Sequence, residues 1–437
     1  MNDASIVGKI LIEGKLVLKS PLLIGDGAGE TSDNFKDIHV LTNHDGKPFI
    51  PGTSLCGVLR DYMSGVNPAM VDKIFGDGNK MQSSIQIDDI ELEDKKIISR
   101  DGVKIDGYTG VGVKGAKYDY EAVERGNKGK LRLLINLRGA HLKDMENVTD
   151  AIKTLMSKLQ SGIKLGALTT KGFGLTVAEN LTANHYDFHN KADVIAWLTD
   201  KPASKKFSPA AEKISINSND FIVDAEFKIN SSLIIRDYEV SADDKNKNIS
   251  AVSLKSRKDF VIPGTSLKGI FRHRAEYILR KLNKDIKTLD NLMGTADDTK
   301  IKSRFIVEES YIKPEGVAEI PHTRNKIDRI TGGTLQGTLF TTKPIWNKNA
   351  AIKIHFEIHN AKDFEAGLAI CLLRDMWLGH VEIGGEKSVG RGTVSGNSAT
   401  INFKGKTYKL NDKGKVTGDA KEISRLASAI KNWGESE

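Results

Sequence analysis

At 437 residues the chain is too long for one ordinary hydrophobic core, so two domains of roughly 200 residues are expected. It is 39% hydrophobic and 28% charged, as folded proteins are, and its formal net charge of +8 permits a polyanionic partner without requiring one. Two cysteines, Cys56 and Cys371, exclude a disulfide framework and a structural zinc site. The chain also has no signal-peptide layout and no run of about 18 apolar residues, so we expect a soluble cytoplasmic protein without a membrane partner.

One peptide occurs twice in the chain. FIPGTSLCGVLRDYM occupies 49–63, and VIPGTSLKGIFRHRA occupies 261–275. In each half a strand-like segment comes first, at 14–27 and at 225–238, and a polar loop then leads to the I-P-G-T-S-L turn and its helix.

Further landmarks follow in the same order in both halves. They are a hydrophobic-Gly element, a strand, the phrase K-I-D-x-x-T-G, a strand of period 2, an apolar helix and a glycine-rich hairpin. In that order, their positions are 74–77 and 292–295, from Ser84 and from Arg304, Lys104–Gly110 and Lys326–Gly332, 131–139 and 351–359, 150–162 and 364–379, and 165–177 and 383–394. A shared order over this length indicates an internal duplication.

The element order of each half predicts a fold class. Strand, helix, strand, strand, helix, strand is the ferredoxin-like β-α-β-β-α-β unit of α+β proteins, which RNA-recognition domains also use. We therefore expect a first domain at 1–182, a linker with a short helix at 183–222, a second domain at 223–404 and a C-terminal tail at 405–437.

The glycine-rich hairpins allow two interpretations. They are either hairpin turns with a bulge or loops whose free N–H groups lie along a phosphate chain. A cation in each copy favours the ligand-facing interpretation. The candidate RNA-binding residues are Lys171, Gly172, Gly174, Gly390, Arg391 and Gly392.

The I-P-G-T-S-L turn predicts a Thr or Ser N-cap and a helix N-terminus that suits an anion. Basic residues follow on the two helices, where they are either solvated surface charges or RNA contacts. The K-I-D-x-x-T-G loops add basic residues interleaved with glycines, which suits a nucleic-acid backbone. The candidates are Ser54, Arg60, Ser266, Lys268, Arg272 and Arg274 on the helices, and Lys104, Arg324, Lys326 and Arg329 at the loops.

Other motifs carry little weight. GVGVKG at 110–115 matches G-x-G-x-x-G but lacks the strand-then-helix context of a dinucleotide site, and no Walker A phrase is present. His185 and His189 have no third ligand nearby in the sequence. His355 and His359 are expected on the polar face of a strand, facing solvent or RNA.

Taken together, the motifs resemble those of the RAMP superfamily of CRISPR–Cas proteins. The first set reads LLIGDG, DGKPFIPGTSLCGVLR (45–60) and GALTTKGFG (166–174), and the second reads LIIRD, KDFVIPGTSLKGIFR (258–272) and GGEKSVGRG (384–392). KIDRITG at 326–332 is most similar to backbone subunits of type III effector complexes. The resemblance covers nearly the whole chain outside the expected linker and tail.

The resemblance implies a subunit that packs beside other type III effector subunits along a guide RNA (crRNA). A β-hairpin thumb after the I-D-x-x-T-G segment then displaces one base pair of the guide–target duplex at intervals. Active subunits of this type cut the target RNA beside each displaced base, with a loop aspartate and a divalent metal, Mg²⁺ or Mn²⁺. Two copies suggest a fusion of two backbone subunits, as in III-D-like systems.

The resemblance also selects an aspartate in the first half. DIHVLTNHDGKPFIPG aligns without a gap with the family's loop, which makes Asp37 the expected catalytic and metal-binding residue. Ile38 and His39 stand where a polar residue and a proline are common. Asp33 and Asp26 are the alternatives within the same loop region.

In the second half Ile249 occupies the aligned position. That half is therefore either a spacer that does not cut or a nuclease that uses Asp244. Two further functions stay open for the whole chain. One is a structural crRNA-binding subunit without cleavage, and the other is a CRISPR-RNA processing endonuclease, although no His/Tyr/Lys cluster recurs in the two copies.

Overall fold

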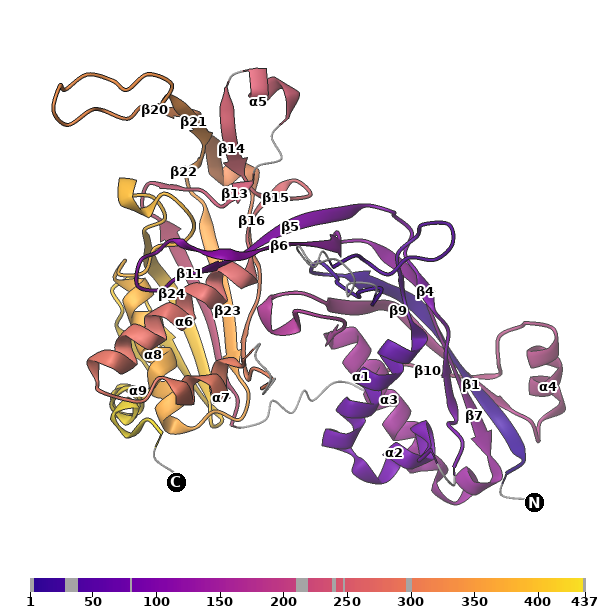
Figure 1. Cartoon of the computed structure of the whole chain (residues 1–437). Coiled ribbons are helices and arrows are strands. Elements are labelled where there is room, and N and C mark those ends of the chain that lie inside the picture. Colours follow the sequence, from indigo (N-terminus) through magenta and orange to yellow (C-terminus); the bar gives the residue numbers. More distant parts are fainter. Residues whose placement is uncertain are drawn as a thin grey trace. The chain divides into compact units, whose positions relative to one another are not determined.

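The computed structural model describes residues 4–27, 38–78, 81–209, 219–237, 241–246, 248–295 and 301–434. The chain divides into two compact units, the first built mainly from residues up to 214 and the second mainly from residue 215 onward (Figure 1). Each unit is centred on one antiparallel sheet and has its own hydrophobic core.

The first sheet has the strand order β10-β9-β1-β7-β3. Its strands are β1 (Ile6–Leu18), β3 (Ile85–Ile87), β7 (Lys128–Arg138), β9 (Leu175–Asp187) and β10 (Lys205–Phe207). Helices α1 (Gly52–Val66), α2 (Pro68–Phe75) and α3 (Met145–Ser161) contribute buried side chains to the same core as the strands. Counting only the four strands of the repeat, β1, β3, β7 and β9, the order 4-1-3-2 is that of the ferredoxin-like fold.

The segment predicted as a linker is largely part of the first domain. Strand β9 continues to Asp187, beyond the predicted domain end at 182, and β10 pairs with it. Helix α4 (Lys191–Leu198) packs on the outer face of the sheet, where the rings of Tyr186 and Trp197 lie 5.2 Å apart. The outer face of the sheet is therefore partly buried, which the alternating pattern of β9 does not reveal by itself. Because of this burial, residues 183–207 belong to the first domain.

The second sheet repeats the arrangement, with the order β17-β23-β11-β24-β25-β26. Its strands are β11 (Phe221–Ile229), β17 (Phe305–Val307), β23 (Ala351–Ile358), β24 (Val394–Phe403), β25 (Lys406–Leu410) and β26 (Val416–Thr417). Helices α6 (Gly264–Lys281) and α8 (Asp363–Trp377) cover one face of it (Figure 1). The two domains thus confirm the predicted tandem ferredoxin-like fold.

The residues predicted as a C-terminal tail extend this second domain. Strands β25 and β26 join the sheet, and helix α9 (Ala420–Ala429) packs against α8. Gly367 of α8 permits the close contact, because a Cβ there would overlap the carbonyl oxygen of Leu426. The apolar face of α9 therefore has its partner within the domain.

Each domain carries a hairpin between its second and third sheet strands. The first thumb consists of β5 (Ile97–Ile105), β6 (Gly112–Val123) and the turn between them. The second thumb consists of β20 (His322–Arg324), β21 (Phe340–Lys343) and the loop that joins them, which extends away from the rest of its domain (Figure 1). GVGVKG thus lies in a thumb turn and strand, and not in a dinucleotide-binding loop.

Short elements complete the structure. The strands are β2 (Phe49–Ile50), β4 (Ile90–Glu91), β8 (Ile163–Lys164), β12 (Ser232–Leu233), β13 (Arg236–Asp237), β14 (Ile249–Ser253), β15 (Lys255–Ser256), β16 (Asp259–Ile262), β18 (Ser310–Ile312), β19 (Val317–Glu319) and β22 (Ile345–Asn347). The helices are α5 (Ala242–Asn246) and α7 (Asp290–Met293), with 3₁₀ turns at Gly139–Asp144, Thr169–Lys171, Lys287–Leu289, Pro314–Gly316, Lys387–Val389 and Ile430–Asn432. In the part of the chain that the structure describes, no helix is long and apolar enough to cross a membrane.

Candidate nucleic-acid interface

The K-I-D-x-x-T-G phrase forms the same turn in both thumbs. The Asp106 carboxylate accepts hydrogen bonds from the backbone N–H of Tyr108 at 3.1 Å, from that of Thr109 at 2.7 Å and from the Thr109 hydroxyl at 2.8 Å. Asp328 accepts the equivalent three bonds in the second thumb. These bonds hold the pKa of both carboxyl groups below the usual value. The acid that recurs in both halves therefore shapes the turn.

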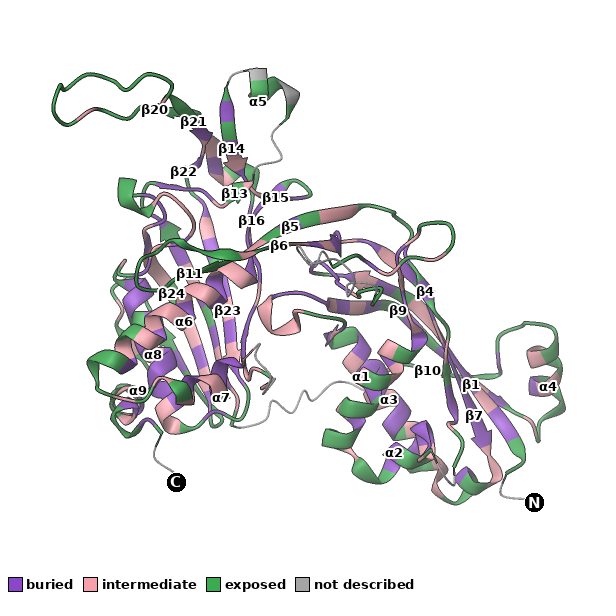
Figure 2. Ribbon diagram, in the orientation of Figure 1, coloured by how far each residue is buried: buried purple, intermediate pink, exposed green. Residues whose placement is uncertain are grey.

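This turn presents one apolar side chain to solvent in each thumb. Tyr108 is 91% exposed, and Ile330, at the same position of the second phrase, is 95% exposed. Figure 2 shows that both thumbs are exposed toward their tips and partly buried toward their bases. A rigid turn that holds an apolar side chain in water is suited to pack against a base or wedge between two bases. These two residues were not among the predicted contacts, although the Asp-x-x-Thr spacing is typical of an Asx turn, in which the residues between Asp and Thr face outward.

The loop before the I-P-G-T-S-L turn starts and ends beside the first thumb. Its two ends are joined, because the N–H of Asp26 donates to the His39 carbonyl at 3.2 Å. Ile38 forms a parallel bridge with Tyr120 of β6, and its carbonyl accepts from the N–H of Glu121 at 2.9 Å. The described ends of the loop are therefore fixed at the thumb base.

The second half repeats this anchorage. Ile249, which aligns with Asp37, the residue before Ile38, starts β14 and pairs in parallel with Thr341 of β21. The same two pieces of sequence, loop end and thumb base, thus meet in both domains. Sequence comparison found each piece but not their contact.

The candidate catalytic acids have different surroundings. Asp37 and Asp33 lie outside the described residues, so their prediction stays untested. Asp26 lies at the described start of the loop. Asp244 is mostly buried and pairs with the Lys343 ammonium at 3.1 Å, while its Oδ2 accepts from the Ser241 hydroxyl at 3.0 Å.

The predicted Thr or Ser helix cap is wrong in both copies. Each helix begins at a glycine, with Pro51 or Pro263 at the N-cap and no side-chain cap bond. Ser54 and Ser266 therefore lie inside the first turn. In the first half the Gly52 N–H donates to the Asp89 carboxylate at 2.7 Å. A protein carboxylate already occupies part of the place where an anion would bind.

Most of the repeated glycines have structural reasons. Gly174 and Gly392 have φ of +79° and +83°, and a Cβ there would overlap the carbonyl oxygens of Leu165 and Ile383. The Gly392 N–H donates to Ser232 at 2.8 Å, as the Gly174 N–H does to Pro21 at 2.7 Å. These N–H groups are therefore not available to phosphates. Gly390 differs, because no atom lies within 4 Å of its Cβ position.

Four of the predicted RNA-binding cations are held by protein groups. Lys268 is 7% exposed and donates to Ser303 at 2.7 Å. Arg272 pairs with Glu276 and Asp290, and Arg274 donates to the buried Asp375 at 2.7 Å. Arg391 is 3% exposed and donates to Glu386 at 2.7 Å. The contacts of these four favour a structural role.

Glu386 is the centre of a buried charge cluster at the base of the second thumb. Arg236, Arg324 and Arg391 all pair with its carboxylate, and Arg391 also contacts His322. Burial would raise the pKa of Glu386, but the arginines lower it overall. The predicted candidate Arg324 therefore belongs to this cluster.

Exposed cations remain on the thumbs and on α1. Lys104, Lys326 and Arg329 are exposed beside the turns, and Arg60 is exposed with Asp72 at 3.7 Å. Lys171 is half-buried at the end of a 3₁₀ turn, and Gly172, with φ of +88°, follows it. Of the predicted RNA-binding cations, those that stay exposed thus lie mainly at the thumbs.

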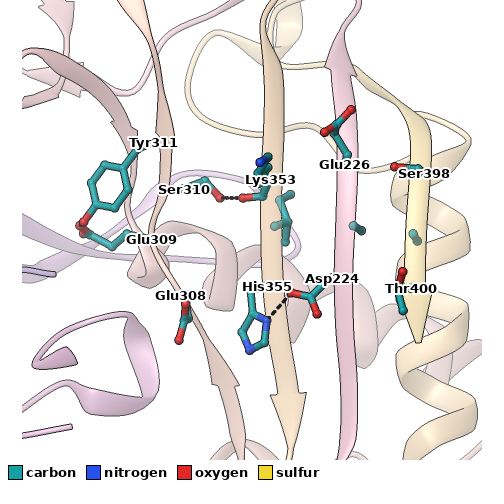
Figure 3. Close-up of a pocket in the computed structure, with 13 residues that line it drawn as sticks. Asp224, Glu226, Glu308, Glu309, Ser310, Tyr311, Lys353, His355, Ser398 and Thr400 are labelled. Atoms are coloured by element: carbon teal, nitrogen blue, oxygen red, sulfur yellow. Dashed lines mark hydrogen bonds and ion pairs between the residues drawn. The ribbon is translucent and has the colours of Figure 1, made fainter. Parts of the chain in front are cut away.

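The outer sheet faces do not resemble the aromatic face of RNA-recognition domains. Helix α4 covers that of the first domain. That of the second domain holds a depression of about 560 Å³ lined by the carboxylates of Asp224, Glu226, Glu308 and Glu309 against Lys353 and His355 (Figure 3). Such a lining repels phosphates.

His355 lies on the polar face of its strand, as expected, and acids hold it in this depression. Its Nδ1 lies 2.8 Å from Asp224, and Glu357 and Glu308 lie nearby. Burial alone would lower its pKa, but these acids raise it to about 10. No group of three or more His, Cys, Asp or Glu side chains suited to a metal occurs within the described ranges.

Comparison with known proteins agrees with this architecture. The family model described as RAMPs, the RAMP superfamily, matches residues 15–177 and 226–395, which together form most of the chain. The chain belongs to the RAMP superfamily, with one copy in each half, and is thus a CRISPR-associated RNA-binding protein. No curated protein matches it.

Proposed function

We propose that this protein is a two-copy backbone subunit of a type III, III-D-like CRISPR effector complex that binds crRNA and cleaves complementary target RNA. The observation that carries the proposal is the anchorage of Ile38 at the first thumb base, because Asp37 directly precedes Ile38 in the chain. If a thumb displaces a base and an acid cleaves the RNA beside that base, the acid must lie close to the thumb.

The chemistry proposed for the first half is transesterification by the RNA itself. The 2′-oxygen of the nucleotide attacks the adjacent phosphorus as its proton leaves, and the bond from phosphorus to the 5′-oxygen breaks as that oxygen gains a proton. A cyclic phosphate and a 5′-hydroxyl result. The protein's main task is in-line positioning, for which a fixed thumb and a nearby carboxylate as proton acceptor suffice.

A divalent metal fits this site as a weakly held ion. Mg²⁺ keeps several waters and uses one or two carboxylates together with substrate phosphates. Asp37 is the proposed ligand, and Asp26, at the described start of the same loop, offers a second carboxylate of the same kind. When bound, the ion supplies charge stabilisation to the phosphate.

In the second half we propose a spacer that binds RNA without cutting. Asp244 is engaged with Lys343 and Ser241 and lacks the freedom of a catalytic base. The remaining alternative for the whole chain is a structural crRNA-binding subunit, which the same thumb geometry would serve equally well.

The test is cleavage of a labelled target by the complex assembled on crRNA with Mg²⁺ or Mn²⁺. Asp37→Ala should slow cleavage by at least about 100-fold, the usual contribution of a positioned acid or base, and leave target binding unchanged. Asp33→Ala and Asp244→Ala serve as matched controls and should leave the product bands intact. An unchanged ladder with Asp37→Ala would assign cleavage to another acid, and a wild-type complex that gives no ladder would favour the purely structural subunit.

A further inference from the structure

One arginine at the base of the first thumb has a charge that the described protein does not neutralise. Arg100 of β5 is 4% exposed, and both terminal nitrogens of its guanidinium are buried without a hydrogen-bond partner in the described part of the chain. A buried cation without a counter-charge costs several kcal/mol, so such groups are rare unless something outside the free fold binds them.

The register of the first thumb places Arg100 opposite Tyr120. The N–H of Glu124 donates to the Lys96 carbonyl, and a Cβ on Gly102 would meet the Tyr118 ring. In both pairs the two residue numbers add up to 220, so residue 100 of β5 lies opposite residue 120 of β6. Tyr120 is also the residue that pairs with Ile38. Arg100 therefore lies across one strand from the end of the loop to which we assign cleavage.

The second domain has a histidine at the corresponding position, beside an arginine whose charge an acid balances. Arg100 lies four residues before Lys104, and His322 lies four residues before Lys326, so the two positions correspond. His322 contacts Arg391, whose charge is balanced by Glu386. The second thumb base thus has its own acid.

The first domain has no acid at the corresponding position. At the offset of 218 residues that aligns the glycine loops, Leu168 replaces Glu386 and Phe173 replaces Arg391. The backbone is unchanged, because Leu168 and Glu386 have φ of +58° and +59°. Arg100 therefore lies near a loop of equivalent backbone that carries Leu168 in place of the acid.

We propose that Arg100 is an anion-binding residue of the first thumb base and that its ligand is a phosphate of the bound RNA. The proposal rests on the proposed function and deepens it. Guanidinium groups bind phosphate with paired N–H donors, and the flexible side chain can reach the thumb surface by rotation about its own bonds. The RNA then supplies in the first half the negative charge that Glu386 supplies in the second.

The experiment compares Arg100→Met, Arg100→Lys and the control Arg132→Met in the full chain. Arg132 lies on β7 of the same domain, where it pairs with Asp88 at 3.0 Å on the surface. Three quantities are measured: the melting temperature of the free protein, the salt dependence of crRNA binding, and target binding and cleavage by the assembled complex.

The expected results separate a ligand-binding arginine from a structural one. Arg100→Met should leave the melting temperature of the free protein unchanged or raise it, because an uncompensated buried charge is removed. It should weaken RNA binding and reduce the slope of log K against log salt by about 0.7, the value for one contact to a single-stranded phosphate. Arg100→Lys should restore most of the slope. Loss at the crRNA stage identifies a guide phosphate, and loss only at the target stage identifies a target phosphate.

The opposite pattern would overturn the proposal. If Arg100→Met lowers the melting temperature by several degrees and leaves the salt slope unchanged at both stages, Arg100 is a structural cation. The Asp37→Ala assay keeps the two proposals apart. Cleavage that depends on Asp37 while Arg100→Met binds RNA normally rejects only the role of Arg100.

Discussion

The glycine-rich hairpins offer a sharp test of which repeated residues build the fold and which face a ligand. In Gly392→Ala the new Cβ would overlap the Ile383 carbonyl oxygen, and the residue would have to keep a φ of +83°. The left-handed conformation costs about 1–2 kcal/mol and the overlap about 1–3 kcal/mol more. In Gly390→Ala the φ of +80° imposes the first cost alone, because the Cβ position is empty.

A loss of 1 kcal/mol shifts the melting temperature of a domain of about 200 residues by roughly 2–4 °C. Differential scanning calorimetry of the second-domain transition should therefore show a loss of about 4–20 °C for Gly392→Ala and about 2–8 °C for Gly390→Ala. crRNA affinity, measured below both transitions, should fall for Gly390→Ala if that glycine faces RNA. Equal thermal losses for the two variants, or a stable Gly392→Ala protein that no longer binds RNA, would refute the reasoning.

Three further outcomes are expected. Replacing Tyr108 or Ile330 by Ser should leave the melting temperature within about 1 °C, since exposed side chains contribute little, yet change the target cleavage pattern or binding; melting curves and a cleavage ladder check this, and a wild-type ladder for both would remove their role as wedges. Because the pKa of His355 is raised to about 10 in the folded state, its stabilising contribution is complete below about pH 6.5 and is lost as the pH rises toward 10. Melting temperature against pH should therefore fall less steeply in that window for His355→Gln than for the wild type, and equal slopes would contradict the ion pair of His355 with Asp224 drawn in Figure 3. Arg274→Met should cost about 1–3 kcal/mol, because the buried Oδ2 of Asp375 loses its hydrogen bond while Arg374 still pairs with Oδ1, whereas Arg274→Met with Asp375→Leu should recover most of that loss in urea unfolding.

Much of the architecture follows from local sequence. The duplication, the element order and the strands of period 2 predict two ferredoxin-like domains, because a hydrophobic period leaves few ways to bury the apolar face. The K-I-D-x-x-T-G phrase carries its own turn, since Asp106 and Thr109 are close enough in the chain to bond to each other whatever surrounds them. Patterns of this kind act over a few residues and can be read directly.

The fate of the individual charges could not be read in the same way. Arg60, Arg272 and Arg391 look alike in the sequence, yet one is exposed, one is paired on α6 and α7, and one is buried against Glu386. Each outcome depends on acids that are distant in the sequence or that belong to another helix or loop. The predicted N-cap failed for a related reason, since the helix begins at the glycine itself and Asp89 comes from another part of the chain.

The sequence by itself determined the repeated modules, their strand order and the turn that exposes Tyr108 and Ile330, because those features depend on period and spacing along the chain. Only the tertiary structure decided which cations keep their charge for a partner. Arg391 meets a glutamate that folding brings to it, whereas Arg100, near the corresponding loop of the other half, meets none among the described residues. A charge is available or neutralised according to what lies within a few ångströms of it, and that neighbourhood exists only once the chain has folded.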